Sequence, residues 1–200
     1  MHMKQEDSKT ARTRHQGPLP DAALTARFLR GDESAFDAIV RRHEGTVRSI
    51  LTRLTGNADD GEELAQETFM RVYISLSRFR GKASLRTWIL RIATNLARDL
   101  LRSRRRKSPP LPLGAAELNA LEAPINGGPP AVALFREKSR AVAAALEQLP
   151  FKQRAALICK IIGDMGYDEI ARVIGSTRNS VKSNIHLGRR RLMAILGDRL

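Results

Sequence analysis

Apolar residues recur at intervals of three and four positions along most of the chain, and this spacing predicts helices. The pattern is most regular over residues 65–76 and 85–100, and a less regular version covers residues 33–54. The apolar positions in chain order are Phe36, Val40, Val47 and Leu51; Ala65, Phe69, Val72 and Leu76; and Leu85, Ile89, Ile92, Leu96 and Leu100. Alternating β-branched and polar residues, the pattern of a strand, are absent. We therefore expect an all-α fold.

The second half continues the helical spacing through Phe135, Val142, Leu146 and Leu149, and the pattern ends at Pro150. Between the halves runs "SPPLPLGAAELNALEAPINGGPP", which carries prolines and glycines at both ends. Because proline interrupts a helix, no long helix is expected to cross this stretch.

The pattern thus divides the chain into two small helical domains joined by a flexible linker. We expect an N-terminal helical bundle at residues 21–107, a linker at 108–131 and a C-terminal domain at 132–200. Residues 1–20 are expected to form a disordered basic tail. The sequence leaves open whether the two domains pack together.

The C-terminal domain contains "GYDEIARVIGSTRNSVKSNIHLGRRRL", which predicts a helix-turn-helix. Ile170 and Ile174 would face inward from the first helix, and the turn would begin at Gly175. Thr177 would then cap the second helix, from which Val181 and Ile185 would face inward. The outer face of that helix would carry Arg178, Lys182, Ser183, His186, Arg189 and Arg190. A polar and basic face of this kind suits the major groove of duplex DNA, although a plain helical hairpin with a basic surface remains the alternative.

Charge makes a nucleic-acid partner plausible for the whole chain. The 200 residues include 35 Lys and Arg against 21 Asp and Glu, giving a net charge of +14, and such a balance favours a polyanion. Against this background, "ADDGEELAQETF" at residues 58–69 is unusually acidic. A helix would place Asp59, Glu63 and Glu67 four residues apart on one solvent-facing surface, together with Asp60 and Gln66.

Acidic residues commonly occupy a helix N-terminus, and this explains part of the cluster. It does not explain Glu67, which lies beyond the first turn. Like charges four apart repel by some tenths of a kcal/mol unless a cation answers them. We therefore favour a docking surface for a basic partner over a merely solvated face. No nucleophile or metal-ligand spacing accompanies these carboxylates, so we expect no enzyme activity, no cofactor and no metal site.

A second functional stripe is expected on the helix that follows Ser84, its candidate N-cap. The face away from the apolar positions carries Trp88, Arg91, Asn95, Arg98 and Arg102, and the run Arg104–Lys107 closes it. An aromatic ring among arginines suits an unpaired nucleic-acid strand, because bases stack on the ring while guanidinium groups hold phosphates. Burial of Trp88 against a neighbouring helix is an equally open reading.

The compartment follows from what the chain contains. Cys159 is the only cysteine and lies in the apolar stretch "ALICKII", so a buried thiol in a reducing cytoplasm is expected. No apolar run approaches the ~20 residues that span a bilayer, so we expect no membrane insertion.

Taken together, the motifs resemble a bacterial RNA polymerase sigma factor of the extracytoplasmic-function group of the sigma-70 family. "GDESAFDAIVRRHEGTVRSIL", "DDGEELAQETFMRVY" and "FRGKASLRTWILRIATNLARDLLR" are similar to the family's second region. "LEQLPFKQRAALICKIIGDMGYDEIARVIGSTRNSVKSNIHLGRRRL" is similar to its fourth region. The four motifs stand in the family's order over roughly residues 26–196.

The resemblance implies roles for the candidate residues. Asp60, Glu63, Gln66 and Glu67 would bind the coiled-coil clamp of the largest subunit of core RNA polymerase. The minus-ten element would be captured as a single strand by Arg80, Lys82, Ser84, Trp88, Arg91, Asn95 and Arg98. The minus-thirty-five element would be read in duplex promoter DNA by Arg178, Asn179, Lys182, Ser183, His186, Arg189 and Arg190. The family also implies an inhibitory anti-sigma factor.

This sequence departs from the family in the recognition helix, where Asn179-Ser180 and Leu187-Gly188 replace common pairs. Gly188 is expected to weaken the helix by ~1 kcal/mol relative to Ala. The alternative function is a free-standing helix-turn-helix regulator that binds duplex DNA through the second domain alone. That reading leaves the carboxylates and the Trp88 helix without a role.

Overall fold

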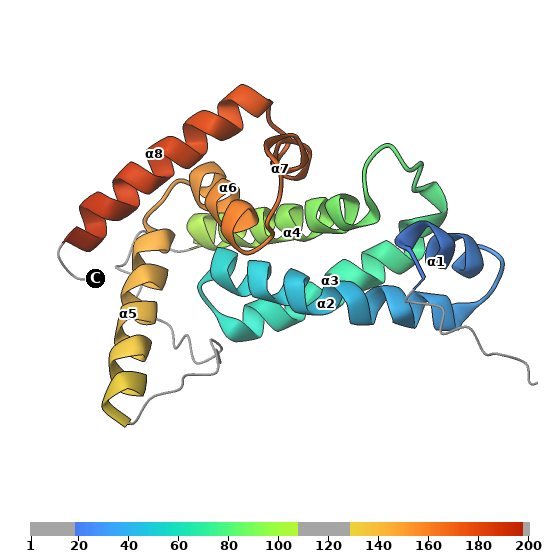
Figure 1. Ribbon diagram of the computed structural model, residues 1–200, viewed down its shortest axis with the longest axis horizontal. Helices are drawn as coiled ribbons and strands as arrows, with labels where there is room; N and C mark the ends of the chain where they lie inside the picture. The colour runs from blue at the N-terminus through green and yellow to red at the C-terminus, as the bar shows by residue number, and fades with distance from the viewer. Residues whose placement is uncertain (1–18, 108–128, 198–200) are drawn as a thin grey trace, which may run out of the picture.

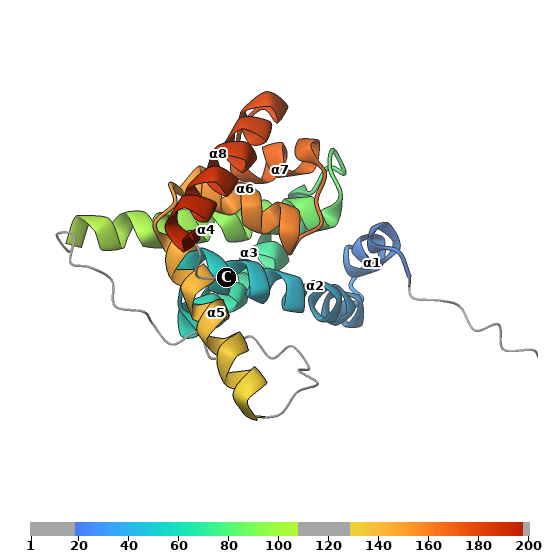
Figure 2. The same ribbon diagram turned by 60° about the vertical axis from the view of Figure 1, so that its left-hand side comes forward.

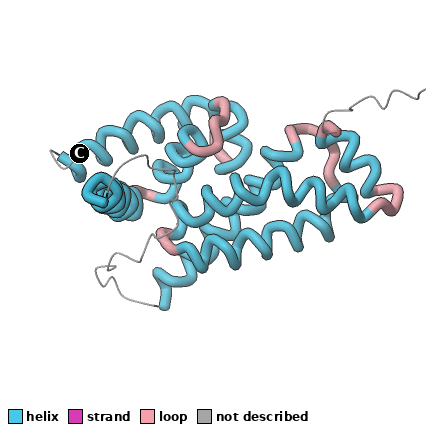
Figure 3. Tube along the Cα trace, turned by 60° about the horizontal axis from the view of Figure 1, so that its bottom comes forward, coloured by secondary structure: helices cyan, strands magenta, loops and turns pink. Residues whose placement is uncertain are grey.

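The computed structural model describes residues 19–107 and 129–197, without the side chains of residues 129–136. Most of the tail expected at 1–20 and of the linker expected at 108–131 lies outside these ranges, and residues 129–131 of the expected linker belong to the first turn of a helix. Every regular secondary-structure element of the described residues is a helix, and loops or turns join the helices, which confirms the all-α expectation (Figure 3). The helices are α1 (Asp21–Phe28), α2 (Glu33–Thr55), α3 (Ala58–Ser75), the 3-10 turn η1 (Leu76–Arg78), α4 (Leu85–Lys107), α5 (Pro129–Glu147), α6 (Phe151–Ile161), α7 (Tyr167–Ile174) and α8 (Arg178–Leu196).

The N-terminal half is built on α2, α3 and α4, which pack against one another in pairs (Figure 1). The expected apolar faces of α3 and η1 are buried at Ala65, Phe69, Val72 and Leu76. Close contact between α2 and α3 depends on Gly61, because a Cβ there would lie 2.2 Å from Thr52 Oγ1 and 2.8 Å from the Thr52 amide nitrogen. Glycine at this position lets the two backbones approach.

The helix α1 is tied to α2 by polar contacts. Asp21 accepts a hydrogen bond from Arg42 at 2.6 Å, and its other carboxylate oxygen lies 3.0 Å from Nε2 of His43. Burial lowers the pKa of His43, and the neighbouring carboxylate of Asp21 opposes that shift only in part. An aromatic cluster of Phe28, Phe36 and Tyr73 then joins α1, α2 and α3.

The C-terminal half contains the expected helix-turn-helix in α7 and α8. Ile170, Ile174, Val181 and Ile185 are buried as predicted. Gly175 begins the turn in the left-handed region, at φ 63°, which glycine adopts without strain.

The expectation that Gly188 merely weakens α8 was incomplete. Gly188 is buried where α8 crosses α6, and a Cβ there would lie 2.8 Å from Cδ1 of Leu157. Glycine therefore allows close contact between α8 and α6, although its helix propensity is lower than that of alanine. Cys159, also on α6, is fully buried, as expected, and burial raises the pKa of its thiol to about 12.

The two halves pack against each other, which the sequence had left open. Helix α7 packs against α4, and α6 packs against α2, as Figures 1 and 2 show from two directions. Their buried apolar residues form one continuous core. At its edge the carboxylate of Glu147, from the end of α5, occupies the space beside Gly56 that a side chain would need. Burial raises the pKa of Glu147, while Arg154 acts in the opposite direction.

Candidate partner and nucleic-acid interfaces

The acidic surface begins at the N-terminus of α3, which Asn57 caps by accepting a hydrogen bond from the Asp60 amide at 2.9 Å. Glu63 and Gln66 are exposed, and neither makes a hydrogen bond or ion pair with another described residue. Glu67 accepts a hydrogen bond from Arg71 at 2.7 Å on the same helix. Three of the four candidate docking residues therefore present polar atoms to solvent.

Asp60 differs from the expectation that the whole stripe faces solvent. Its side chain is only 13% exposed, and both carboxylate oxygens accept hydrogen bonds from Arg104, at 2.5 and 2.6 Å. Arg104 was expected to meet a polyanion with its neighbours and is instead held by Asp60. Together with Arg71, it supplies part of the positive charge that the stripe requires. Because these arginines partly neutralise the carboxylates, charge repulsion among them is weak evidence for an external partner. The exposure of Glu63 and Gln66 is the stronger evidence.

The same face of α3 continues into apolar residues that the sequence reading missed. Met70 is 60% exposed and Ile74 is 74% exposed. The spacing Glu63, Glu67, Met70 and Ile74 is four, three and four, which places them on one side of the helix. This spacing is visible in the sequence itself. A partner that fits the surface would combine cationic and apolar side chains.

On α4 the start of the predicted strand-binding region has the expected local structure. Ser84 Oγ accepts a hydrogen bond from the Thr87 amide at 3.2 Å, which confirms the cap. Trp88 is half-buried, and its ring centroid lies 5.2 Å from that of Phe79, so it packs within its own half while keeping an accessible edge. The exposed positions around it are Arg80, Lys82, Ser84, Arg91 and Arg102, with Asn95 half-buried.

Arg98 differs from these exposed residues, because its side chain contacts the C-terminal half. Its Nη2 donates to the carbonyl oxygen of Ile174 at 3.3 Å, and its guanidinium lies 5.3 Å from the centroid of the Phe151 ring. The reason is a second buried face on α4 that the sequence reading did not trace, which contains Leu90, Thr94 and Ala97. Helix α7 packs on α4, and Arg98 lies at the boundary between the face of α4 that α7 covers and the face that is exposed to solvent.

The recognition helix α8 presents its predicted face without obstruction from other described residues. Thr177 Oγ1 accepts a hydrogen bond from the Ser180 amide at 3.2 Å, so the predicted cap is confirmed. The residues Arg178, Asn179, Lys182, Ser183, His186, Arg189 and Arg190 are all exposed. Arg178 pairs with Asp168 of α7 at 3.1 Å, and Ser183 Oγ donates to the Asn179 carbonyl at 3.2 Å.

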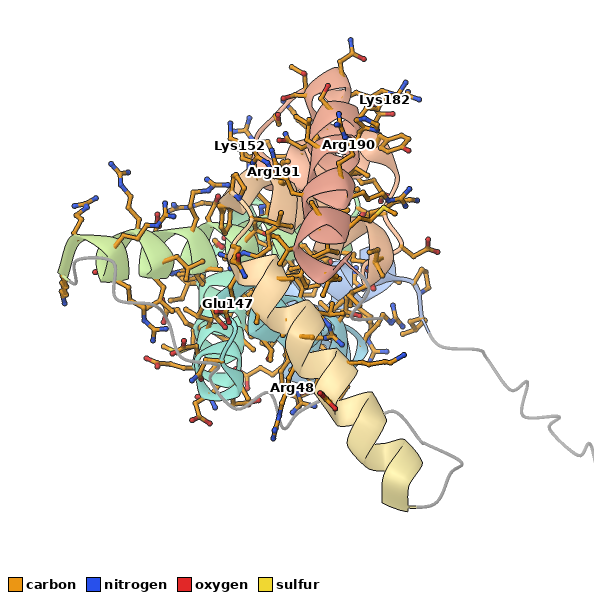
Figure 4. The ribbon with its side chains drawn as sticks, turned by 90° about the vertical axis from the view of Figure 1, so that its left-hand side faces the viewer. Arg48, Glu147, Lys152, Lys182, Arg190 and Arg191 are labelled. Carbon is orange, nitrogen blue, oxygen red and sulfur yellow. The ribbon has the colours of Figure 1, made fainter. Side chains whose placement is uncertain are left out.

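Two further basic residues extend this surface beyond the predicted set. Figure 4 shows Lys182 and Arg190 projecting from α8, with Lys152 and Arg191 on its other flank. Arg191 donates to the side chain of Gln153 at 3.0 Å, which links α8 to the start of α6 beside Lys152. The triple arginine run had signalled Arg191, but nothing local signalled Lys152. The basic surface therefore spans α6 and α8.

No described helix is long and apolar enough to cross a membrane. No group of three or more His, Cys, Asp or Glu side chains in the described ranges is placed to hold a metal ion.

Comparison with known proteins shows which family this chain belongs to. Residues 39–107 match the family described as Sigma-70 region 2, and residues 139–192 match Sigma-70, region 4. The RNA polymerase sigma-H factor of Pseudomonas aeruginosa is 31% identical over 173 residues, covering 84% of this chain and 90% of that protein. The ECF RNA polymerase sigma-E factor of Escherichia coli is 30% identical over 178 residues, covering 86% and 91%.

Solved structures agree with this assignment. CnrH in complex with the cytosolic domain of CnrY has a TM-score of 0.65 and 26% identity, covering 88% of this chain and 96% of that chain. The sigma factor RpoE in complex with the anti-sigma factor NepR from Bartonella quintana has a TM-score of 0.61 and 20% identity, covering 82% and 97%, a likeness of fold. The resemblance seen in the motifs is thereby confirmed, and the chain belongs to the extracytoplasmic-function sigma factors of the sigma-70 family, which are non-enzymatic transcription initiation factors.

Proposed function

We propose that this sigma factor docks on core RNA polymerase through α3 and addresses promoter DNA through α4 and α8. The observation that carries the proposal is the separation of charge between exposed helix faces. The acidic face of α3 holds Glu63, Gln66 and Glu67, while the predicted outward residues of α8 between Arg178 and Arg190 are polar or basic, with Leu187 and Met193 as exposed apolar neighbours. One surface is thus electrostatically matched to a basic polypeptide and the other to a polyanion.

Docking on the polymerase would use a mixed surface. The carboxylates of Glu63 and Glu67 would bind arginines of the clamp coiled coil, and Met70 and Ile74 would contact its apolar side chains. Asp60 would take part either by exchanging Arg104 for a polymerase arginine or by fixing the start of α3. An apolar centre with a charged rim is the usual anatomy of a specific interface.

Promoter recognition would be divided between the halves. The loop from Arg80 to Ser84, with Trp88 and Asn95, would capture the minus-ten strand, where stacking contributes ~1–3 kcal/mol per base. The face of α8 would enter the major groove of the minus-thirty-five duplex. Lys152 and Arg191 would add phosphate contacts beside it, which position the helix without reading sequence.

Control by an inhibitory protein is part of the proposal. RpoE of Bartonella quintana forms a complex with the anti-sigma factor NepR, and the more similar CnrH forms a complex with the cytosolic domain of CnrY. We infer that a comparable anti-sigma factor binds this chain, in the cytoplasm where polymerase and DNA are found.

Run-off transcription with core polymerase tests the central claim. The chain is expected to give transcripts that start at defined promoters, whereas a free-standing regulator would give none. Reversing charge in the double variant Glu63→Lys, Glu67→Lys should weaken polymerase binding by roughly tenfold or more. Glu44→Lys is a matched control, because Glu44 is an exposed acid on α2 with no ion pair to another described residue.

The same double variant should bind a minus-thirty-five duplex as tightly as the native chain, because α8 is unchanged. Polymerase affinity that survives the double reversal, or that falls equally in Glu44→Lys, would remove α3 from the docking surface.

A further inference from the structure

One apolar side chain interrupts the polar outer face of α8 near the middle of the helix. Leu187 is 42% exposed, and it lies four residues after Ser183 and three residues before Arg190. This spacing places the three side chains on one strip of the helix surface. The buried residues Val181 and Ile185 lie on the opposite side. The strip of Leu187 therefore points directly away from the core of the C-terminal half.

Most cations of α8 lie on the two flanks of this strip. At about 100° per residue, Lys182 and Arg189 lie on one flank and Arg191 lies on the other. Figure 4 shows Lys182 and Arg191 on opposite sides of α8, with Lys152 beside Arg191. A helix measures ~10–12 Å across and the major groove is ~12 Å wide, so flanking cations can reach the phosphates of both walls. The strip between the flanks then faces the edges of the bases.

The major groove offers an apolar side chain one well-matched partner, the C5-methyl group of thymine. Guanine presents the acceptors O6 and N7 at the same edge. A leucine placed against them would remove both acceptors from water and return no hydrogen bond, which costs free energy. Leucine on this strip therefore favours thymine and disfavours guanine.

The surroundings of Leu187 do not form an apolar patch for a protein partner. The other large apolar residue that is exposed on α8 is Met193, near the end of the helix. Arg190 is exposed and lies between the two along the helix. Leu187 thus stands alone among polar groups, as a contact with a single base methyl requires.

Resting on the function proposed above, we propose that Leu187 is a specificity-determining residue that contacts the methyl group of one thymine in the minus-thirty-five element. Leu187 belongs to one of the pairs at which the recognition helix departs from its family. The thymine preference therefore distinguishes the promoters of this chain from those of relatives with a polar residue at this position.

Selection from a randomised promoter identifies the base. A promoter found by start-site mapping with the native chain is randomised across its minus-thirty-five element and transcribed by core polymerase with each variant. The native chain should prefer thymine at one position. Leu187→Ala should lose that preference there and keep the preferences at other positions, because its side chain ends at Cβ. Leu187→Met keeps an apolar side chain of similar length and should retain the preference. A thymine preference at no position, or one that Leu187→Ala leaves intact, overturns the proposal.

Deoxyuridine at the selected position tests the methyl contact itself, because it lacks only the C5-methyl group and pairs as thymine does. Binding of the native holoenzyme to the promoter duplex should weaken by about fourfold, the effect expected for returning one buried methyl group to water. Leu187→Ala should bind the thymine and deoxyuridine duplexes equally. Met193→Ala is the matched control and should show the same fourfold loss as the native chain. Equal losses in the native chain and Leu187→Ala would refute the contact.

The salt dependence separates this contact from a phosphate contact. Leu187→Ala should leave the slope of log affinity against log salt unchanged, because an apolar contact releases no counterions. A reduced slope would contradict the proposal. Absence of promoter-dependent transcription by the native chain with polymerase would refute the underlying function. Transcription that requires the minus-thirty-five element but no thymine methyl would refute the role of Leu187 alone, so the two failures are distinguishable.

Discussion

Substituting Gly61 by Ala tests the packing that positions the acidic helix. The new Cβ would lie 2.2 Å from Thr52 Oγ1, 2.8 Å from the Thr52 nitrogen and 2.9 Å from its Cα. The two latter atoms are backbone, so no side-chain rotation relieves them, and α3 must move away from α2 by several tenths of an ångström or more. Overpacking of this kind costs ~1–3 kcal/mol, and the upper end applies where the backbone is the obstacle.

Helix propensity acts in the opposite direction, since Ala in a helix interior is favoured over Gly by ~1 kcal/mol. The expected net effect of Gly61→Ala is a loss of ~2 kcal/mol from the free energy of unfolding. Gly45→Ala is the matched control, because Gly45 lies within α2 and a Cβ there meets no atom within 4 Å. That variant keeps the propensity gain alone and should stabilise the protein by up to ~1 kcal/mol.

Urea unfolding followed by circular dichroism at 222 nm measures both variants against the native chain. At ~2–4 °C per kcal/mol for a protein of this size, the melting temperatures of the two variants should also differ by ~6–12 °C. A Gly61→Ala protein as stable as Gly45→Ala would refute the close approach of α2 and α3. Reduced polymerase affinity of Gly61→Ala, with folding intact, would further indicate that the position of α3 determines docking.

Three other predictions concern single side chains. Lys182→Ala should weaken binding of a minus-thirty-five duplex and reduce the slope of log affinity against log salt by about 1, and an unchanged slope would exclude a phosphate contact. Because burial lowers the pKa of His43, the unfolded chain binds the extra proton first as pH falls below ~6.5, so stability falls with acidification. In urea titrations between pH 7 and pH 5, the free energy of unfolding of His43→Gln should depend less on pH than that of the native chain. An equally steep dependence would mean that another titrating group causes it. Cys159 should react with a maleimide only after denaturant is added, and rapid labelling of the native chain would contradict its burial.

The helix-turn-helix was predictable because its signals are local. The helical spacing of buried positions, the glycine at the turn and the threonine cap lie within a few residues of one another, and all three occur as expected in α7 and α8. The same holds for the Ser84 cap and the buried face of α3. Capping and periodicity are properties of a short segment, so they survive whatever packs around it.

The features that were missed depend on partners distant in sequence. Asp60 and Arg104 stand 44 residues apart, and nothing near either residue indicates their ion pair. Arg98 looked equivalent to Arg91 on a helical wheel, yet α7 covers one and leaves the other exposed. The apolar spacing of Leu90 and Ala97 was visible, but a pattern shows that a face is buried without showing which helix covers it. The roles of the individual DNA- and polymerase-binding residues stay predictions.

The contact between Trp88 and Phe79 has a practical consequence. Trp88 is the only tryptophan in the chain, and its ring is half-buried beside the loop that precedes α4. Its intrinsic emission therefore originates from a single place, next to where an unpaired base would arrive. If α4 captures the minus-ten strand as proposed, stacking of a base on the indole would quench that emission, and the unlabelled protein would report promoter melting optically.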